Sequence, residues 1–130
     1  MNALFVYLPT CRTAEEIADA LRSATIPVAD VLPNGRGLVE YGRDRDHVWF
    51  FVERRPAEVA NAFRGLLRRD PEACVIVLEY SFIDAVKAVA AVLASQPGAV
   101  IDTDCGDTID GSGFLARLES DPWWDWRRPT

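Results

Sequence analysis

The residues best suited to chemistry are four aspartates that follow an apolar run near the end of the chain. They are Asp102, Asp104, Asp107 and Asp110. Clustered carboxylates are typical ligands of Ca²⁺. A calcium loop of the EF-hand type starting at Asp102 would need an oxygen ligand at its fifth position and a glutamate at its twelfth, but Gly106 and Gly113 stand there. The spacing therefore predicts no tight metal site. It leaves open a weak cation site, or a turn in which Asp110 or Ser112 caps a helix.

The same stretch resembles two enzyme motifs. Asp102-Thr103-Asp104 resembles the DxD of haloacid-dehalogenase phosphatases, in which one aspartate attacks phosphorus and the other handles the leaving-group proton. The run DTDCGDTID at 102–110 resembles the DTDPGxDD calcium motif of nucleoside hydrolases. Both families place the motif near the start of a much longer parallel-sheet domain, whereas about 20 residues follow it here. We therefore expect a non-enzyme without catalytic residues or cofactors. The alternative is a small enzyme or nucleotide-handling domain that uses Asp102 and Asp104.

The remaining reactive side chains do not complete a catalytic site. His47 is the only histidine, and Asp44 and Asp46 lie beside it in the sequence. It has no serine or cysteine motif around it, so we expect a structural histidine. The three cysteines are an odd number without CxxC spacing, which indicates neither a disulfide framework nor a zinc ribbon.

The end of the chain is acidic and rich in tryptophan. Residues 98–130 hold seven acids against three bases, so they carry −4 of the chain's net charge of −6. Tryptophans so close together usually pack one or two rings onto their own domain, which predicts a C-terminal clasp. A ring left exposed would be an anchor for a partner. The predicted partner-binding residues are Asp102, Asp104, Asp107, Asp110, Glu119, Asp121, Trp123, Trp124, Asp125 and Trp126.

Length and composition predict a single cytoplasmic domain. A chain of 130 residues, 49% hydrophobic and 26% charged, is large enough for one core and is ordinary for a globular protein. No apolar run approaches the roughly 20 residues of a membrane span, and the first residues lack the pattern of a signal peptide. The negative charge disfavours nucleic acid and favours a basic partner.

Alternating strand and helix signals predict an α+β fold. Strands are expected at 3–8, 38–43, 47–54, 74–78, 100–103 and 108–109, with a loop over 27–35. Helices are expected from the Thr13/Glu16 capping box, from Pro56, from 81 to 95 and from 113 to 119. Both faces of 47–54 are apolar, so this strand should be central. The first six elements predict a split βαβ, ferredoxin-like core with two helices on one face of an antiparallel or mixed sheet; the C-terminal helices and strands form an appendage.

Two helices carry apolar stripes that must be covered. The stripe of the helix from Pro56 contains Val59, Phe63, Leu66 and Leu67. The helix over 81–95 opens with a second capping box, Ser81 with Asp84, and its only charged residues are Asp84 and Lys87. Two arrangements would cover this second helix: a homodimer contact through Val86, Val89 and Leu93, or residues 98–126 folded back over it.

The segment from Ser81 to Trp126 resembles the carboxy-terminal parts of small bacterial immunity proteins of polymorphic toxin systems. The likeness lies in an Ala-rich helix leading to PGAVIDTD at 97–104, then Phe114-Leu115, then the closing Trp124-Asp125-Trp126. These families are short, acidic, cytoplasmic and often α+β, and they neutralise a toxin by covering its active site. The resemblance implies a stoichiometric inhibitor of a basic toxin such as a nuclease or deaminase. It carries over no interface positions, and a homo-oligomeric scaffold is a third interpretation.

Overall fold

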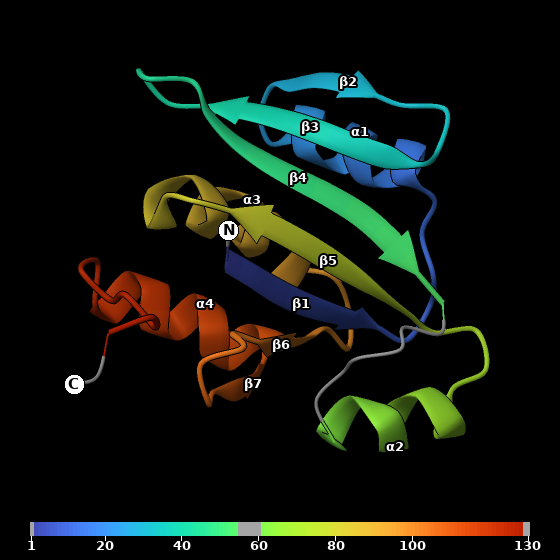
Figure 1. The fold of residues 1–130 in the computed structure, drawn as a ribbon. Helices are drawn as coiled ribbons and strands as arrows, with labels where there is room; N and C mark the ends of the chain where they lie inside the picture. The colour runs from blue at the N-terminus through green and yellow to red at the C-terminus, as the bar shows by residue number, and fades with distance from the viewer. Residues whose placement is uncertain (1, 55–60, 129–130) are drawn as a thin grey trace.

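The computed structural model describes residues 2–54 and 61–128, which form one antiparallel sheet with helices on both faces (Figure 1). The strands are β1 (Asn2–Leu8), β2 (Val28–Val31), β3 (Arg36–Tyr41), β4 (Asp46–Glu53), β5 (Cys74–Tyr80), β6 (Val100–Asp102) and β7 (Thr108–Asp110). The helices are α1 (Ala14–Ser23), α2 (Asn61–Arg69), α3 (Ile83–Ala94) and α4 (Gly111–Ser120). The strand order is β2-β3-β4-β5-β1-β6-β7, and each neighbouring pair is antiparallel.

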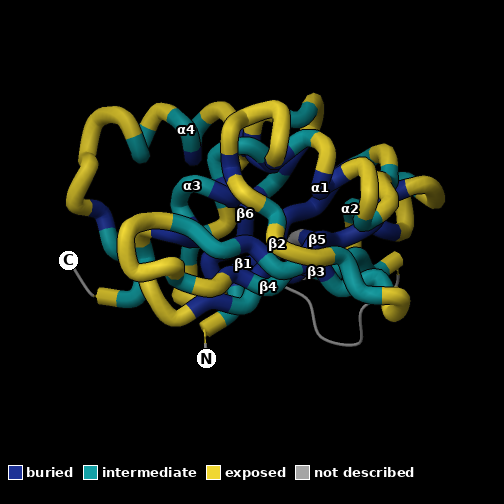
Figure 2. Tube along the Cα trace, turned by 90° about the horizontal axis from the view of Figure 1, so that it is seen from above, coloured by how far each residue is buried: buried dark blue, intermediate teal, exposed yellow. Residues whose placement is uncertain are grey.

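The sheet is covered on both faces because its central strands are apolar on both sides. Ile76 and Leu78 of β5 belong to a core that also contains buried side chains of α1, α3 and α4. The alternate residues Val75 and Val77 face the other way and pack with Phe63 of α2. In Figure 1, α1 and α3 lie behind the sheet. Figure 2 shows the buried residues gathered between the sheet and these helices.

The α+β class is confirmed, but the ferredoxin-like arrangement is not found. In a split βαβ core β1 would pair with β4, whereas here β5 lies between them and pairs with both. This strand takes the central place because six of its seven residues are buried. The two helices expected on one face, α1 and α2, belong to cores on opposite faces. Helix α3 is no appendage either, because it lies in the main core.

Several local predictions can be checked against the structure. The Thr13/Glu16 capping box is present, and β4 lies inside the sheet as expected. The second capping box is wrong: the N-cap of α3 is Phe82, which makes no side-chain cap bond. The expected loop over 27–35 contains the short edge strand β2, paired to β3 through the turn at Gly35. Pro56 and Val59 lie outside the described residues.

The apolar face of α3 is covered by the chain itself. Val86, Val89 and Leu93 are fully buried in the main core, together with Phe114 of α4 and two tryptophans of the tail. Of the two arrangements considered for this helix, the fold-back of the C-terminal segment is therefore the one observed. These three side chains are not available as a dimer contact.

The contact between α3 and α4 depends on a glycine at the start of α4. A Cβ on Gly111 would lie 2.2 Å from the backbone oxygen of Ala94, whereas a Cβ on the exposed Gly65 of α2 would meet nothing within 4 Å. We expect Gly111→Ala to lower the free energy of unfolding by about 2 kcal/mol through overpacking. Gly65→Ala should raise it by up to about 1 kcal/mol through helix propensity. Denaturant unfolding measures the free energy of unfolding of both variants. Equal changes in the two would contradict the close approach of Gly111 to the backbone of Ala94.

Candidate functional site

The aspartates at 102–110 lie in the turn that joins β6 to β7 and at the start of α4. Asp102 is only 8% exposed, and its Oδ1 accepts a hydrogen bond from the backbone N–H of Asp104 (2.9 Å). Burial raises the pKa of Asp102, and the charge of Asp104 adds to this effect. Asp110 is the N-cap of α4, where its Oδ1 accepts from the backbone N–H of Gly113 (2.7 Å), as the turn interpretation predicted. Asp102 and Asp110 therefore accept backbone hydrogen bonds within the turn and the helix cap, while Asp104 is exposed and Asp107 is half-buried.

Within residues 2–54 and 61–128, no group of three or more His, Cys, Asp or Glu side chains is arranged to hold a metal ion. His47 is exposed on β4, with its Nε2 3.8 Å from Glu40 Oε1, and β4 lies on the other side of the central strand β5 from β6 and β7.

Two of the three tail tryptophans form the predicted clasp. Trp124 and Trp126 are 3% and 4% exposed, and their ring centroids lie 5.2 Å apart in an edge-to-face arrangement. Phe114 of α4 lies 5.6 Å from the Trp124 ring and 5.8 Å from the Trp126 ring. The Trp126 indole N–H also donates a buried hydrogen bond to the hydroxyl of Tyr80 at the end of β5 (2.7 Å). The clasp thereby ties the tail to both α4 and the sheet.

The third tryptophan points away from this cluster. Trp123 is 92% exposed, and Phe82 at the start of α3 is 59% exposed; these are the exposed large apolar side chains among the described residues. Two hydrogen bonds lay the tail along the beginning of α3: Lys87 Nζ donates to the carbonyl of Pro122 (3.1 Å) and Arg127 to the carbonyl of Ser81 (2.9 Å). Each of these carbonyls belongs to the residue next to Trp123 or Phe82. The two exposed rings therefore lie at the same end of the molecule.

Exposed acids accompany these two rings. Asp84 lies in the first turn of α3, while Glu119 and Asp121 lie at the end of α4, shortly before Trp123. We call Phe82, Asp84, Glu119, Asp121 and Trp123 the anchor surface. Sequence reasoning included Glu119, Asp121 and Trp123 but missed Phe82 and Asp84. An aromatic residue just before a helix, outside its apolar stripe, is the signal that would have found Phe82.

Asp125 is an ion-pair residue rather than a free acid. Its Oδ1 accepts from Arg127 Nε and its Oδ2 from an Arg127 terminal nitrogen, both at 2.9 Å, while Arg128 Nε lies 3.6 Å from Oδ2. The Arg127 hydrogen bonds are the main cause that lowers the pKa of Asp125 to about 2. The acidic C-terminal segment therefore contains a carboxylate that is already neutralised by two arginines. From the sequence, these arginines were counted in the net charge but were not expected to pair with Asp125.

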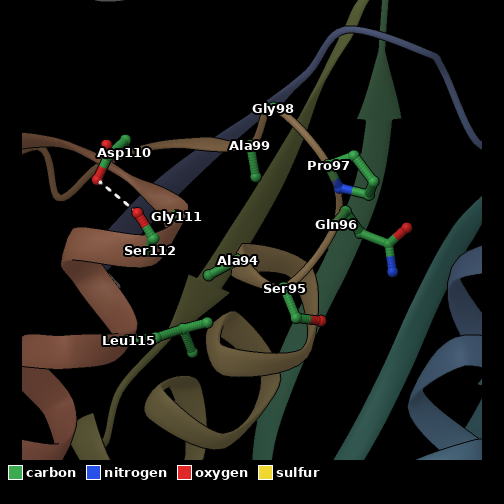
Figure 3. Close-up of a pocket in the computed structure, with 10 residues that line it drawn as sticks. All are labelled: Ala94, Ser95, Gln96, Pro97, Gly98, Ala99, Asp110, Gly111, Ser112 and Leu115. Carbon is green, nitrogen blue, oxygen red and sulfur yellow. Dashed lines mark hydrogen bonds between the residues drawn. The ribbon is translucent and has the colours of Figure 1, made fainter.

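Two cavities elsewhere offer less to a ligand. A cavity of about 470 Å³ lies where α3 ends and α4 begins (Figure 3). Its Ser95 hydroxyl donates to the carbonyl of Val92, and its Asp110 carboxylate is occupied by the α4 cap and by Ser112. A second cavity, of about 330 Å³, adjoins the sheet, where the Arg36 guanidinium lies over the Trp49 and Phe51 rings and pairs with Glu79. Ser95, Asp110 and Glu79 are thus engaged within the fold, whereas the buried Arg36 Nε has no hydrogen-bond partner among the described residues.

Comparison with family models, curated proteins and solved structures gave no match for this chain. The geometry of the chain itself is thus the basis for a functional proposal. Among the helices that the structure describes, none has the length and apolar character needed to cross a membrane.

The clasp can be separated from the anchor surface by stability measurements. Trp126→Phe removes the donor to Tyr80 and leaves a buried hydroxyl without that partner, so we expect the free energy of unfolding to fall by about 2 kcal/mol or more. Trp123→Ala, three residues away, removes an exposed ring and should change it by less than about 0.5 kcal/mol. Denaturant unfolding measures both variants; a large loss from Trp123→Ala would show that this ring is structural.

The Asp125 ion pair predicts a pH dependence. The folded pKa of about 2 lies below the ordinary value of 3.8, so the pair contributes stability that is fully present above pH 4 and is lost as the pH falls toward 2. Asp125→Asn should be less stable at neutral pH and should lose less stability between pH 4 and pH 2 than the native chain. Unfolding curves across this range test it, and parallel losses in the two proteins would contradict the assignment.

Proposed function

We propose that this chain is a bacterial immunity-type protein that binds and neutralises a cognate basic toxin domain, of the nuclease or deaminase class, in the cytoplasm. It is not an enzyme in this proposal, and its mechanism is to cover the toxin's active site. The observation that carries the proposal is Trp123, 92% exposed beside a rigid aromatic clasp. A tryptophan held in water by its own fold gains free energy when a partner buries it, and tryptophan is enriched among binding hot spots.

The support beneath Trp123 favours tight binding. Trp124 follows it directly in the chain and is fixed in the core, and the preceding carbonyl of Pro122 is held by Lys87. The backbone on both sides is thus anchored before any partner arrives. A preorganised anchor loses little conformational entropy on binding, so more of the burial energy appears as affinity.

Charge complementarity favours a basic partner. The anchor surface contributes three exposed carboxylates, from Asp84, Glu119 and Asp121, in a chain of net charge −6. Such a field speeds the encounter with a cationic substrate channel and weakens as salt shortens its range to roughly 8 Å at physiological ionic strength. Of the partner-binding residues predicted from sequence, this proposal keeps Glu119, Asp121 and Trp123. Trp124, Asp125 and Trp126 hold the tail in place, Asp102 and Asp110 accept backbone hydrogen bonds, and Asp104 and Asp107 lie on a separate turn.

The proposal predicts a toxin domain encoded beside this chain's gene, and binding kinetics with that domain test it. Trp123→Ala should speed dissociation more than about tenfold with little change in association, because truncating a hot-spot anchor costs about 2 kcal/mol. Reversing Asp84, Glu119 and Asp121 to Lys should instead slow association and flatten its salt dependence.

The matched control reverses three exposed acids outside the anchor surface, Glu15, Asp30 and Asp44, to Lys. This variant undergoes the same change in net charge, so equal slowing would show that overall charge, not the anchor surface, steers the partner. A further arm reverses Asp104 and Asp107 and leaves the helix cap Asp110 intact. Full protection by Trp123→Ala in co-expression, with native kinetics, would contradict the proposed interface.

A further inference from the structure

We propose that a cleft between α4 and the end of the tail binds a phosphate group of a small molecule. The cleft has a volume of about 390 Å³, within the range of small-molecule sites, and three arginines line it: Arg117, Arg127 and Arg128. They come from the last turn of α4 and from the residues that follow the clasp. This site does not depend on the proposed toxin partner, and it lies outside the anchor surface.

Arg117 is positioned for a ligand and has no carboxylate partner within 4 Å among the described residues. Its guanidinium carbon lies 4.1 Å from the centre of the Trp124 ring, which is itself buried in the clasp. Stacking on a fixed ring restricts the side chain while leaving its N–H donors in the plane of the guanidinium. A planar set of donors held in this way suits the oxygens of a phosphate.

The other two arginines share a single carboxylate. Arg127 binds Asp125 through two nitrogens, and Arg128, whose side chain is 83% exposed, makes only a 3.6 Å contact to the same group. The cleft is also lined by Asp107, so the formal charge of its lining is +2, or +1 when the paired Asp125 is counted as well, in a chain of −6. Burial and the neighbouring acids raise the pKa of Cys105, so this lining thiol adds no negative charge at neutral pH. The cleft therefore carries a local positive charge that an anionic ligand would neutralise.

Phosphate is favoured over a carboxylate by the number of donors and charges. A phosphate ester or pyrophosphate carries more negative charge than one carboxylate, and it has oxygens for more than one guanidinium. Arginine recognises such groups through paired hydrogen bonds, whereas lysine acts as a point charge. All the cationic residues of this cleft are arginines.

The test is a titration of the full chain with inorganic pyrophosphate at constant ionic strength, followed by NMR of the backbone amides and the indole N–H groups. Shifts should be confined to residues 105–107, 117 and 124–128. Arg117→Gln and Arg128→Gln should each weaken binding about tenfold, since each removes a charge-assisted hydrogen-bond donor. Asp107→Asn should tighten binding, a gain that damage to the fold would not produce.

The control is Arg22→Gln on α1, which removes an exposed arginine paired with an acid outside the cleft and should leave the affinity unchanged. If Arg117→Gln disturbs the clasp, Arg128→Gln still tests the site, because the Arg128 side chain is largely in solvent. Absence of localised shifts, or equal weakening by Arg22→Gln, would overturn the site. An equal response to citrate would overturn the assignment to phosphate.

Discussion

The hydrogen bond from the Trp126 indole to the Tyr80 hydroxyl, with the aromatic packing around it, is the constraint on which the C-terminal half depends. Tyr80 ends β5 and pairs with Asn2 of β1 and Val48 of β4, so its backbone lies where three central strands meet. The residue is completely buried, and an unsatisfied hydroxyl there would cost free energy. The indole N–H satisfies that hydroxyl and fixes the tail in the same contact. Through this contact the tail over 121–128, which has little secondary structure, covers one side of the main core.

The two candidate surfaces are consequences of this clasp. Because Trp124 and Trp126 point inward, the residue before them, Trp123, is held outward on a fixed backbone. Because Trp124 is fixed, Arg117 has a stationary ring on which to stack. Because Trp126 is fixed, the following Arg127 reaches both Asp125 and the carbonyl of Ser81. A core contact thus positions an exposed aromatic anchor on one side and a cationic cleft on the other.

Local features were predictable from the sequence, whereas the pairing of strands was not. Periodicity and capping located β1, β4, β5 and α1, since these signals act over a few residues. The position of β5 between β1 and β4 depends on contacts between residues 2–8 and 74–80, which local patterns do not encode. Strand β2 was missed because the flanking Pro27 and Pro33 and the turn after it indicate a loop more strongly than its four residues indicate a strand.

The site predictions show the same division between composition and environment. The sequence gives the net charge, but whether a given carboxylate is free to bind a partner protein depends on the groups that it contacts in the fold. Asp102 and Asp110 are engaged by backbone N–H groups, and Asp125 by Arg127, two residues further along the chain. The Asp125–Arg127 ion pair joins residues two apart, so their spacing could be read from the sequence. The sequence did not indicate that Arg117 stacks on Trp124, seven residues later. It also did not indicate that the tail bonds to Ser81, the residue before Phe82.

Arg127 connects the cleft to the anchor surface. Its Nε and one terminal nitrogen hold Asp125 beside the cleft, while its other terminal nitrogen holds Ser81, the residue before Phe82. A ligand that draws Arg127 toward the cleft would compete with the bond to Ser81, and one that engages only Arg117 and Arg128 would leave it intact. One guanidinium therefore contributes both to the lining of the cleft and to the contact that holds the tail beside the start of α3.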